Sequence, residues 1–185
     1  MASIDSELVI ACHCKTHPPM YHIKDGHLVA LVGPDAVYVD PMCPDNTWAA
    51  IATNSKTYVW GVNCPVAMQI GRVNPEATGE LLRILPEAWR ILKNGGQVIF
   101  PGKYDMSIVA RLQEKIDSDP LFVNKWRFSI VKTEDYPFSL VHINKYSGTP
   151  ITQPVLAIFT KPVAAGRRLR RTRKRRNQSR SKMRK

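Results

Sequence analysis

The charge along this chain changes abruptly after Gly166, and this change limits which part of the chain can fold. The last 19 residues, Arg167–Lys185, contain 12 Arg or Lys and no acidic residue. Residues 1–166 hold the other 15 basic residues and all 15 acidic ones, so the net charge of +12 belongs to the tail. A segment with many like charges and few apolar residues buries too little surface to fold alone. We therefore predict an α/β domain over 1–166 and a disordered basic tail over 167–185.

The folded part has the composition of an ordinary globular domain. Hydrophobic residues make up 44% of the chain, and no apolar run approaches the roughly 20 residues needed to span a bilayer. The first ten residues carry acids and no basic cluster, unlike a secretory signal. The 4 cysteines are then expected to be free thiols. We expect a soluble, intracellular protein that does not enter a membrane.

Apolar runs of two different periods predict the α/β class. Helical spacing follows Asn74-Pro75-Glu76 and stops at Gly95-Gly96, and a second helix is predicted over Asp105–Ile116. The prolines and Asp25-Gly26 within Lys15–Gly26 predict a loop. Short runs of strand length are Leu8–Cys12, His27–Val32, Ala36–Val39, Thr57–Val62, Gln97–Phe100, Trp126–Val131, Ser139–Ile143 and Val155–Phe159. Strands, then helix–strand–helix, then further strands are typical of an α/β domain.

The segment Glu80–Gly102 (ELLRILPEAWRILKNGGQVIFPG) resembles class I S-adenosylmethionine-dependent methyltransferases. In that family a helix runs through a Gly-Gly turn into the fifth strand of a Rossmann-like sheet. The resemblance extends over about Ala36–Lys161 and is most distinctive over Glu87–Phe100. It implies a helix after the fifth strand, then an antiparallel hairpin of the sixth and seventh strands. The last of these is Val155–Phe159, paired with either of the two preceding runs.

The same resemblance implies a site for S-adenosylmethionine. Asp40 follows a predicted strand and occupies the position that holds the ribose hydroxyls in this family. Asn63 and Cys64 follow the predicted fourth strand and would lie where cofactor and substrate meet. No residue is assigned as a general base, and the catalytic residues stay unassigned.

One departure from the family concerns the turn after the first strand. The family has a Gly-rich turn there, which lets the backbone approach the cofactor closely. Residues 13–19 (HCKTHPP) contain no glycine. Two interpretations remain: a cofactor site rebuilt from unusual residues, or a methyltransferase-like fold that has lost its cofactor.

The cysteines and histidines near the N-terminus have the ligand types that zinc prefers. Cys12, Cys14 and His17 are the nearest set, but their C-x-C spacing fits no standard zinc motif. We favour the interpretation that these cysteines pack as small apolar residues, and we predict no metal site.

The basic tail is predicted to bind nucleic acid or another polyanion through its phosphates. It contains no aromatic residue for base stacking, so binding is expected to be independent of sequence and sensitive to salt. RRTRKRR also has the composition of a nuclear localisation signal, which indicates the nucleus or a virion. The residues expected to contact nucleic acid are Arg167, Arg168, Arg170, Arg171, Arg173, Lys174, Arg175 and Arg176. The function predicted from the whole chain is an S-adenosylmethionine-dependent methyltransferase-like protein with a polybasic nucleic-acid-binding tail. The alternative is a catalytically inactive structural or packaging protein that binds nucleic acid and uses a degenerate form of the same fold.

Overall fold

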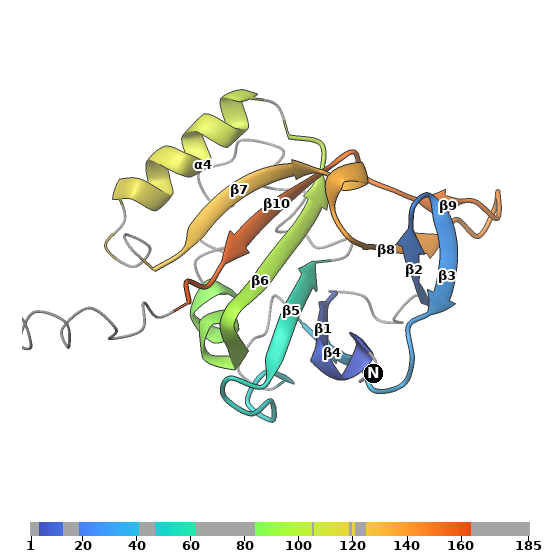
Figure 1. Cartoon of the computed structure of the whole chain (residues 1–185), viewed down its shortest axis with the longest axis horizontal. Helices are drawn as coiled ribbons and strands as arrows, with labels where there is room; N and C mark the ends of the chain where they lie inside the picture. Colours follow the sequence, from blue (N-terminus) through green and yellow to red (C-terminus); the bar gives the residue numbers. More distant parts are fainter. Residues whose placement is uncertain are drawn as a thin grey trace, which may run out of the picture.

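A six-stranded sheet forms the centre of the protein (Figure 1). The computed structural model describes residues 4–12, 19–40, 47–61, 84–104, 106–118, 120 and 125–163. In spatial order the strands of the large sheet are β4 (Val37–Val39), β1 (Leu8–Ala11), β5 (Lys56–Gly61), β6 (Leu92–Gly102), β10 (Val155–Thr160) and β7 (Arg127–Lys132).

The large sheet is parallel on one side and antiparallel on the other. β1 pairs in parallel with both β4 and β5, and β5 pairs in parallel with β6. β10 runs antiparallel between β6 and β7. The helix α4 (Met106–Ser118) precedes β7 in the chain. The predicted antiparallel pairing of the last strand is therefore confirmed, and its partner is the Trp126–Val131 run.

A second, four-stranded antiparallel sheet contains segments from two distant parts of the chain. Its order is β3 (His27–Leu31), β2 (Met20–Lys24), β8 (Ser139–Ile143) and β9 (Pro150–Ile151). β2 and β3 lie between β1 and β4 in the chain, whereas β8 and β9 lie between β7 and β10. The pairing of β2 with β8 thus joins the N-terminal part of the domain sequence to its C-terminal part.

Both faces of the large sheet are buried. Successive side chains of a strand point to opposite faces, and apolar side chains occupy both sets of positions. On one face they pack under the helical residues 84–91 and α4; this cluster includes Val9, Val59, Val98, Ala157, Leu85, Ala88, Ile91 and Ile116. On the other face they pack against the small sheet; this cluster includes Leu8, Trp60, Ile99, Leu156, Met20 and Leu140. A sheet therefore covers the face where a doubly wound fold has helices.

The prediction of a loop over Lys15–Gly26 is wrong for its second half. Met20–Lys24 is the strand β2, paired on both sides. Asp25 and Gly26 have φ values of 52° and 75°, which is the geometry of the two-residue turn that joins strands in a hairpin. The Asp-Gly pair therefore connects β2 to β3.

The helix that precedes β6 ends earlier than the glycine pair predicts. Residues 84–91 are helical and β6 begins at Leu92, so Gly95 and Gly96 lie within the strand. Gly95 has a φ of 84°, which favours glycine, and its N–H donates to the carbonyl of Lys161 at 2.8 Å. The Lys161 N–H in turn donates to the Gly96 carbonyl at 2.9 Å. Pairing with the chain after β10 thus replaces the expected helix-ending turn. The predicted helix start at Asn74 lies outside the described residues.

Candidate functional site

The carboxyl ends of β4, β1 and β5 lie at one edge of the large sheet, because these three strands are parallel. β1 is in the middle, so the chain returns on one side of it as β4 and on the other side as β5. This is a topological switch point, where open α/β sheets bind ligands beyond the carboxyl ends of their strands. We call this the carboxyl edge.

Asp40 lies at the carboxyl edge directly after β4, and hydrogen bonds hold its backbone in place. Its N–H donates to Thr47 Oγ1 at 3.1 Å, and its carbonyl accepts from Trp48 Nε1 at 3.2 Å. On the neighbouring strand, the Cys12 N–H donates to the Val39 carbonyl at 3.0 Å. Asp40 is half-buried. The acidic residue Asp40 is therefore held one strand away from the end of β1.

The segment after Asp40 is attached to the helical residues 84–91 through one side chain. Arg90 donates from one terminal nitrogen to the Ile51 carbonyl at 2.7 Å and from the other to the Trp48 carbonyl at 2.8 Å. Its Nε also pairs with Glu87 at 2.9 Å. Trp48 itself is fully buried. Arg90 was not identified from the sequence, because its partners are main-chain carbonyls about 40 residues away.

β5 ends at Gly61, where a larger side chain does not fit. A Cβ atom on this glycine would lie 2.6 Å from Cδ1 of Phe100 on β6. The Phe100 ring is fully buried and packs edge-on against Phe159. The end of β5 is therefore pressed closely against β6. The predicted cofactor residues Asn63 and Cys64 follow Gly61 and lie outside the described residues.

Of the three weak zinc candidates, Cys12 is the one that lies within the described residues. It is 1% exposed and packs with apolar side chains between the two sheets, as expected for a small apolar residue. Its thiol is not in a disulfide. Within the described ranges, no group of three or more His, Cys, Asp or Glu is placed to hold a metal ion. Cys14 and His17 lie outside these ranges.

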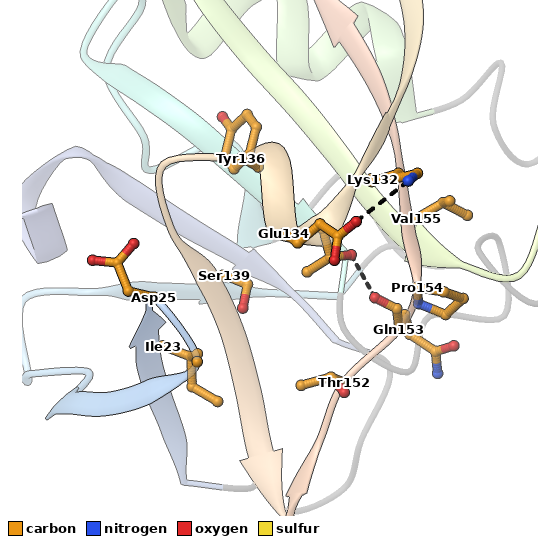
Figure 2. A pocket seen from close by; sticks show the side chains of 12 residues that line it. Ile23, Asp25, Lys132, Glu134, Tyr136, Ser139, Thr152, Gln153, Pro154 and Val155 are labelled. Atoms are coloured by element: carbon orange, nitrogen blue, oxygen red, sulfur yellow. Dashed lines mark hydrogen bonds and ion pairs between the residues drawn. The ribbon is translucent and has the colours of Figure 1, made fainter.

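A cleft of about 600 Å³ opens at the same edge of the sheet, beside the end of β7 and the start of β10 (Figure 2). The short helix η2 (Thr133–Asp135) and the turn between β2 and β3 form its walls. Lys132 Nζ pairs with Glu134 Oε1 at 3.4 Å across exposed surface. The Thr133 hydroxyl donates to the Gln153 carbonyl. Charged and apolar side chains both line the cleft, more of its lining surface is apolar than polar, and its described lining residues include no Cys or His.

Tyr136 is one of the residues that line this cleft, and its hydroxyl stays protonated. The hydroxyl donates to Gln97 Oε1, and Gln97 Nε2 donates to Thr160 Oγ1 at 3.3 Å. Burial raises the pKa of Tyr136 above its ordinary value of 10.0, and the nearby Tyr58 raises it further. This tyrosine therefore acts as a neutral hydrogen-bond donor that links η2 to β6.

The domain is a mixed α/β protein with a largely parallel central sheet and a second, antiparallel sheet. No protein-family model matches the chain, and no curated protein sequence matches it. Among the described helices, none is long and apolar enough to cross a membrane. The basic residues of the tail, from Arg167 onward, lie outside the described residues.

Proposed function

We propose that this protein is an S-adenosylmethionine-dependent methyltransferase-type protein with a Rossmann-like sheet, and that its basic tail binds nucleic acid. The observation that carries the proposal is the position of Asp40. It follows β4 at the carboxyl edge, next to the switch point at β1, with its backbone held by Thr47 and Trp48. A carboxylate at this position can accept a hydrogen bond from each of the two hydroxyl groups of a ribose.

The antiparallel end of the sheet also supports the proposal. β6 follows the segment that resembles the methyltransferases, then α4, and then β7 and β10 as an antiparallel pair. This is the order of elements that the resemblance implies. The small sheet on the second face is a departure, because it occupies the place of covering helices.

The cofactor would bring an electrophilic methyl group to the carboxyl edge. Asp40 would bind its ribose, and Asn63 and Cys64 would line the rim toward the methyl acceptor. The acceptor is most simply a nucleic acid, or a protein bound to one, because the tail would concentrate that partner near the domain. This part of the proposal also implies the nucleus or a virion.

Titration of the full chain with S-adenosylmethionine and S-adenosylhomocysteine by calorimetry tests the cofactor site. We expect binding that Asp40→Asn weakens about tenfold or more, because the neutral amide accepts fewer hydrogen bonds from the ribose. Asp117→Asn is the matched control, since Asp117 is an exposed residue of α4. No binding at millimolar cofactor would overturn the cofactor site.

The alternative function is a structural or packaging protein that uses the tail without catalysis. The glycine-free sequence after β1 favours it, because bulky residues there keep a cofactor away from the backbone. The two functions differ in one readout. The alternative predicts duplex binding without cofactor binding, whereas the favoured function predicts both.

Duplex binding tests the tail. We expect random-sequence DNA to bind the full chain and not a variant that ends at Gly166. If the eight basic residues from Arg167 to Arg176 each contact a phosphate, the slope of log K against log salt is about −7. Equal binding by both variants would overturn the role of the tail.

A further inference from the structure

The cleft beside η2 contains a hydroxyl group that the described part of the protein leaves unused. Ser139, the first residue of β8, lines the cleft and is 5% exposed. Its hydroxyl has no hydrogen-bond partner among the residues that the structure describes. A buried polar group without a partner is unfavourable, so such a group indicates a water or a ligand that completes its hydrogen bonds. The Ser139 hydroxyl is therefore a candidate ligand contact.

The pairing of β8 with β2 places this hydroxyl near the turn that carries Asp25. Ser139 lies opposite Ile23 of β2, and the side chains of directly opposite residues point to the same face of a sheet. Both residues line the cleft, and Asp25 follows Ile23 by two positions. Figure 2 shows Ser139 between Asp25 and Glu134. The unused hydroxyl thus has an acidic residue on each side.

The acidic residues give the cleft an excess of hydrogen-bond acceptors. Asp25 is exposed and forms no ion pair with any described residue. Glu134 pairs with Lys132 through Oε1. These are the charged residues of the described lining, and two carboxylates against one ammonium group give a net charge of −1. An anionic ligand would meet like charges here, whereas a cation that donates hydrogen bonds is complementary.

The other walls of the cleft suit an aliphatic chain. Ile23, Pro154 and Val155 contribute apolar surface, and the volume of about 600 Å³ is ordinary for a small-ligand site. A guanidinium group presents its N–H donors in one plane and is more weakly hydrated than an ammonium group. It can therefore donate to a carboxylate and to a half-hidden hydroxyl at the same time.

We propose that this cleft binds a guanidinium group on an aliphatic stem, the chemistry of an arginine side chain. The guanidinium donates to the Asp25 carboxylate and the Ser139 hydroxyl, and the stem packs against Ile23 and Pro154. The site is independent of the proposed cofactor and of polyanion binding.

This ligand chemistry has two possible sources, a separate small molecule or the arginines of the chain's own tail. The tail follows the far end of β10, whereas the cleft lies at the start of this strand. Six strand residues span about 20 Å, and the residues from 164 onward span more than that when extended. The tail is therefore long enough to reach the cleft.

NMR titration of the full chain with n-butylguanidine tests the site. The matched control ligand is n-butylurea, which has nearly the same shape and no charge. We expect n-butylguanidine to shift the amide signals of Asp25, Gly26 and Ser139 with a Kd of about 1 mM, a usual value for so small a ligand, and n-butylurea to bind about tenfold more weakly. Equal binding of the two ligands, or no binding of n-butylguanidine at about 20 mM, would overturn the proposal.

Two substitutions identify the binding groups. Asp25→Asn removes the charge but keeps a residue that tolerates the φ of 52° in the turn, and it should weaken n-butylguanidine binding about fivefold. Ser139→Ala should weaken it about threefold, because one hydrogen bond is lost. Asp117→Asn is the control, since Asp117 is exposed on α4 and does not line the cleft, and its affinity should not change. A cleft variant that binds like the original chain would contradict the role of that residue, and two such variants would overturn the site.

A full-length variant in which Gln replaces all 12 basic residues of the tail distinguishes the two sources. If the tail occupies the cleft, the amide signals of Asp25 and Ser139 should differ from those of the original chain before any ligand is added. This variant should then also bind n-butylguanidine more tightly, because no arginine competes. If a separate molecule is the ligand, signals and affinity should stay the same at about 0.15 M salt, where charges more than about 8 Å apart are largely screened.

Discussion

The Lys161 ammonium group donates a hydrogen bond to the carbonyl oxygen of Leu92 at 2.7 Å. It also donates to the Trp89 carbonyl at 2.8 Å and to Asn54 Oδ1 at 2.9 Å. Carbonyls at the end of a helix have no partner within the helix, and a cation there also interacts favourably with the helix dipole. The lysine after β10 therefore caps the helical residues 84–91 at the point where β6 begins.

Replacing this lysine should destabilise the domain strongly. Lys161 is 6% exposed, and burial lowers the pKa of its ammonium group. In Lys161→Met the aliphatic stem remains, but the carbonyls lose their donor in a buried setting. We expect the free energy of unfolding to fall by about 3 kcal/mol in urea denaturation. Lys132→Met, at an exposed lysine of β7, should change it by less than about 0.5 kcal/mol. Equal effects of the two substitutions would contradict the capping role.

This cap shows why part of the fold was predictable and part was not. The apolar runs of β1, β5 and β10 are local signals, and they predicted these strands within one residue or so. The capping lysine is 69 residues from Leu92 in the chain, so no local pattern indicates the contact. For the same reason the glycine pair after Lys93 was interpreted as a helix end, although the pairing with Lys161 decides its conformation.

In the candidate site, too, some features are local in the sequence and others depend on tertiary contacts. Asp40 could be proposed as a site residue because an acid directly after a predicted strand is a local feature of the sequence. The attachment of the next segment to Arg90 depends on tertiary contacts. β2 was missed because prolines and Asp25-Gly26 were interpreted as one loop, whereas the Asp-Gly pair alone forms the turn.

Acid should destabilise the protein through Glu7. Lys93 Nζ lies 2.7 Å and 2.6 Å from its two carboxylate oxygens, and the Thr57 hydroxyl donates to it as well. The hydrogen bond from Lys93, followed by that from Thr57, lowers the pKa of Glu7 below its ordinary value of 4.5. Because the folded-state pKa is the lower one, the stabilisation is fully present above pH 4.5 and is lost as the pH falls through the folded-state pKa.

Unfolding measured from pH 7 to pH 3 checks this dependence. The pair is partly exposed, so its contribution at pH 7 is about 1 kcal/mol after screening by solvent. Glu7→Gln should lose this amount at pH 7 and should differ little from the original chain at pH 3. Glu134→Gln, at an exposed pair, is the control and should lose less. A Glu7→Gln deficit that is the same at both pH values would contradict the assignment.

Arg90 should affect the proposed cofactor site through the position of the segment after Asp40. Lysine has one terminal nitrogen and does not span the Trp48 and Ile51 carbonyls as the guanidinium does. We expect Arg90→Lys to reduce the free energy of unfolding by about 1–2 kcal/mol and to weaken S-adenosylmethionine binding several-fold, because the segment after Asp40 loses its attachment. Arg111→Lys, on the exposed surface of α4, should change neither. Unchanged affinity with reduced stability would restrict Arg90 to a structural role.

The close approach of the Phe100 ring to Gly61 should make any larger residue at position 61 destabilising. In Gly61→Ala the new methyl group would lie 2.6 Å from the Phe100 ring, which Phe159 and the core prevent from moving away. Overpacking of this kind typically costs about 1–3 kcal/mol. Phe100→Leu alone also destabilises the core, because it leaves a cavity. The double variant should nevertheless lose less stability than the sum of the two single losses, since the smaller side chain makes room for the methyl group. Urea unfolding of all four proteins measures this coupling, and strictly additive losses would show that the two positions do not compete for the same space.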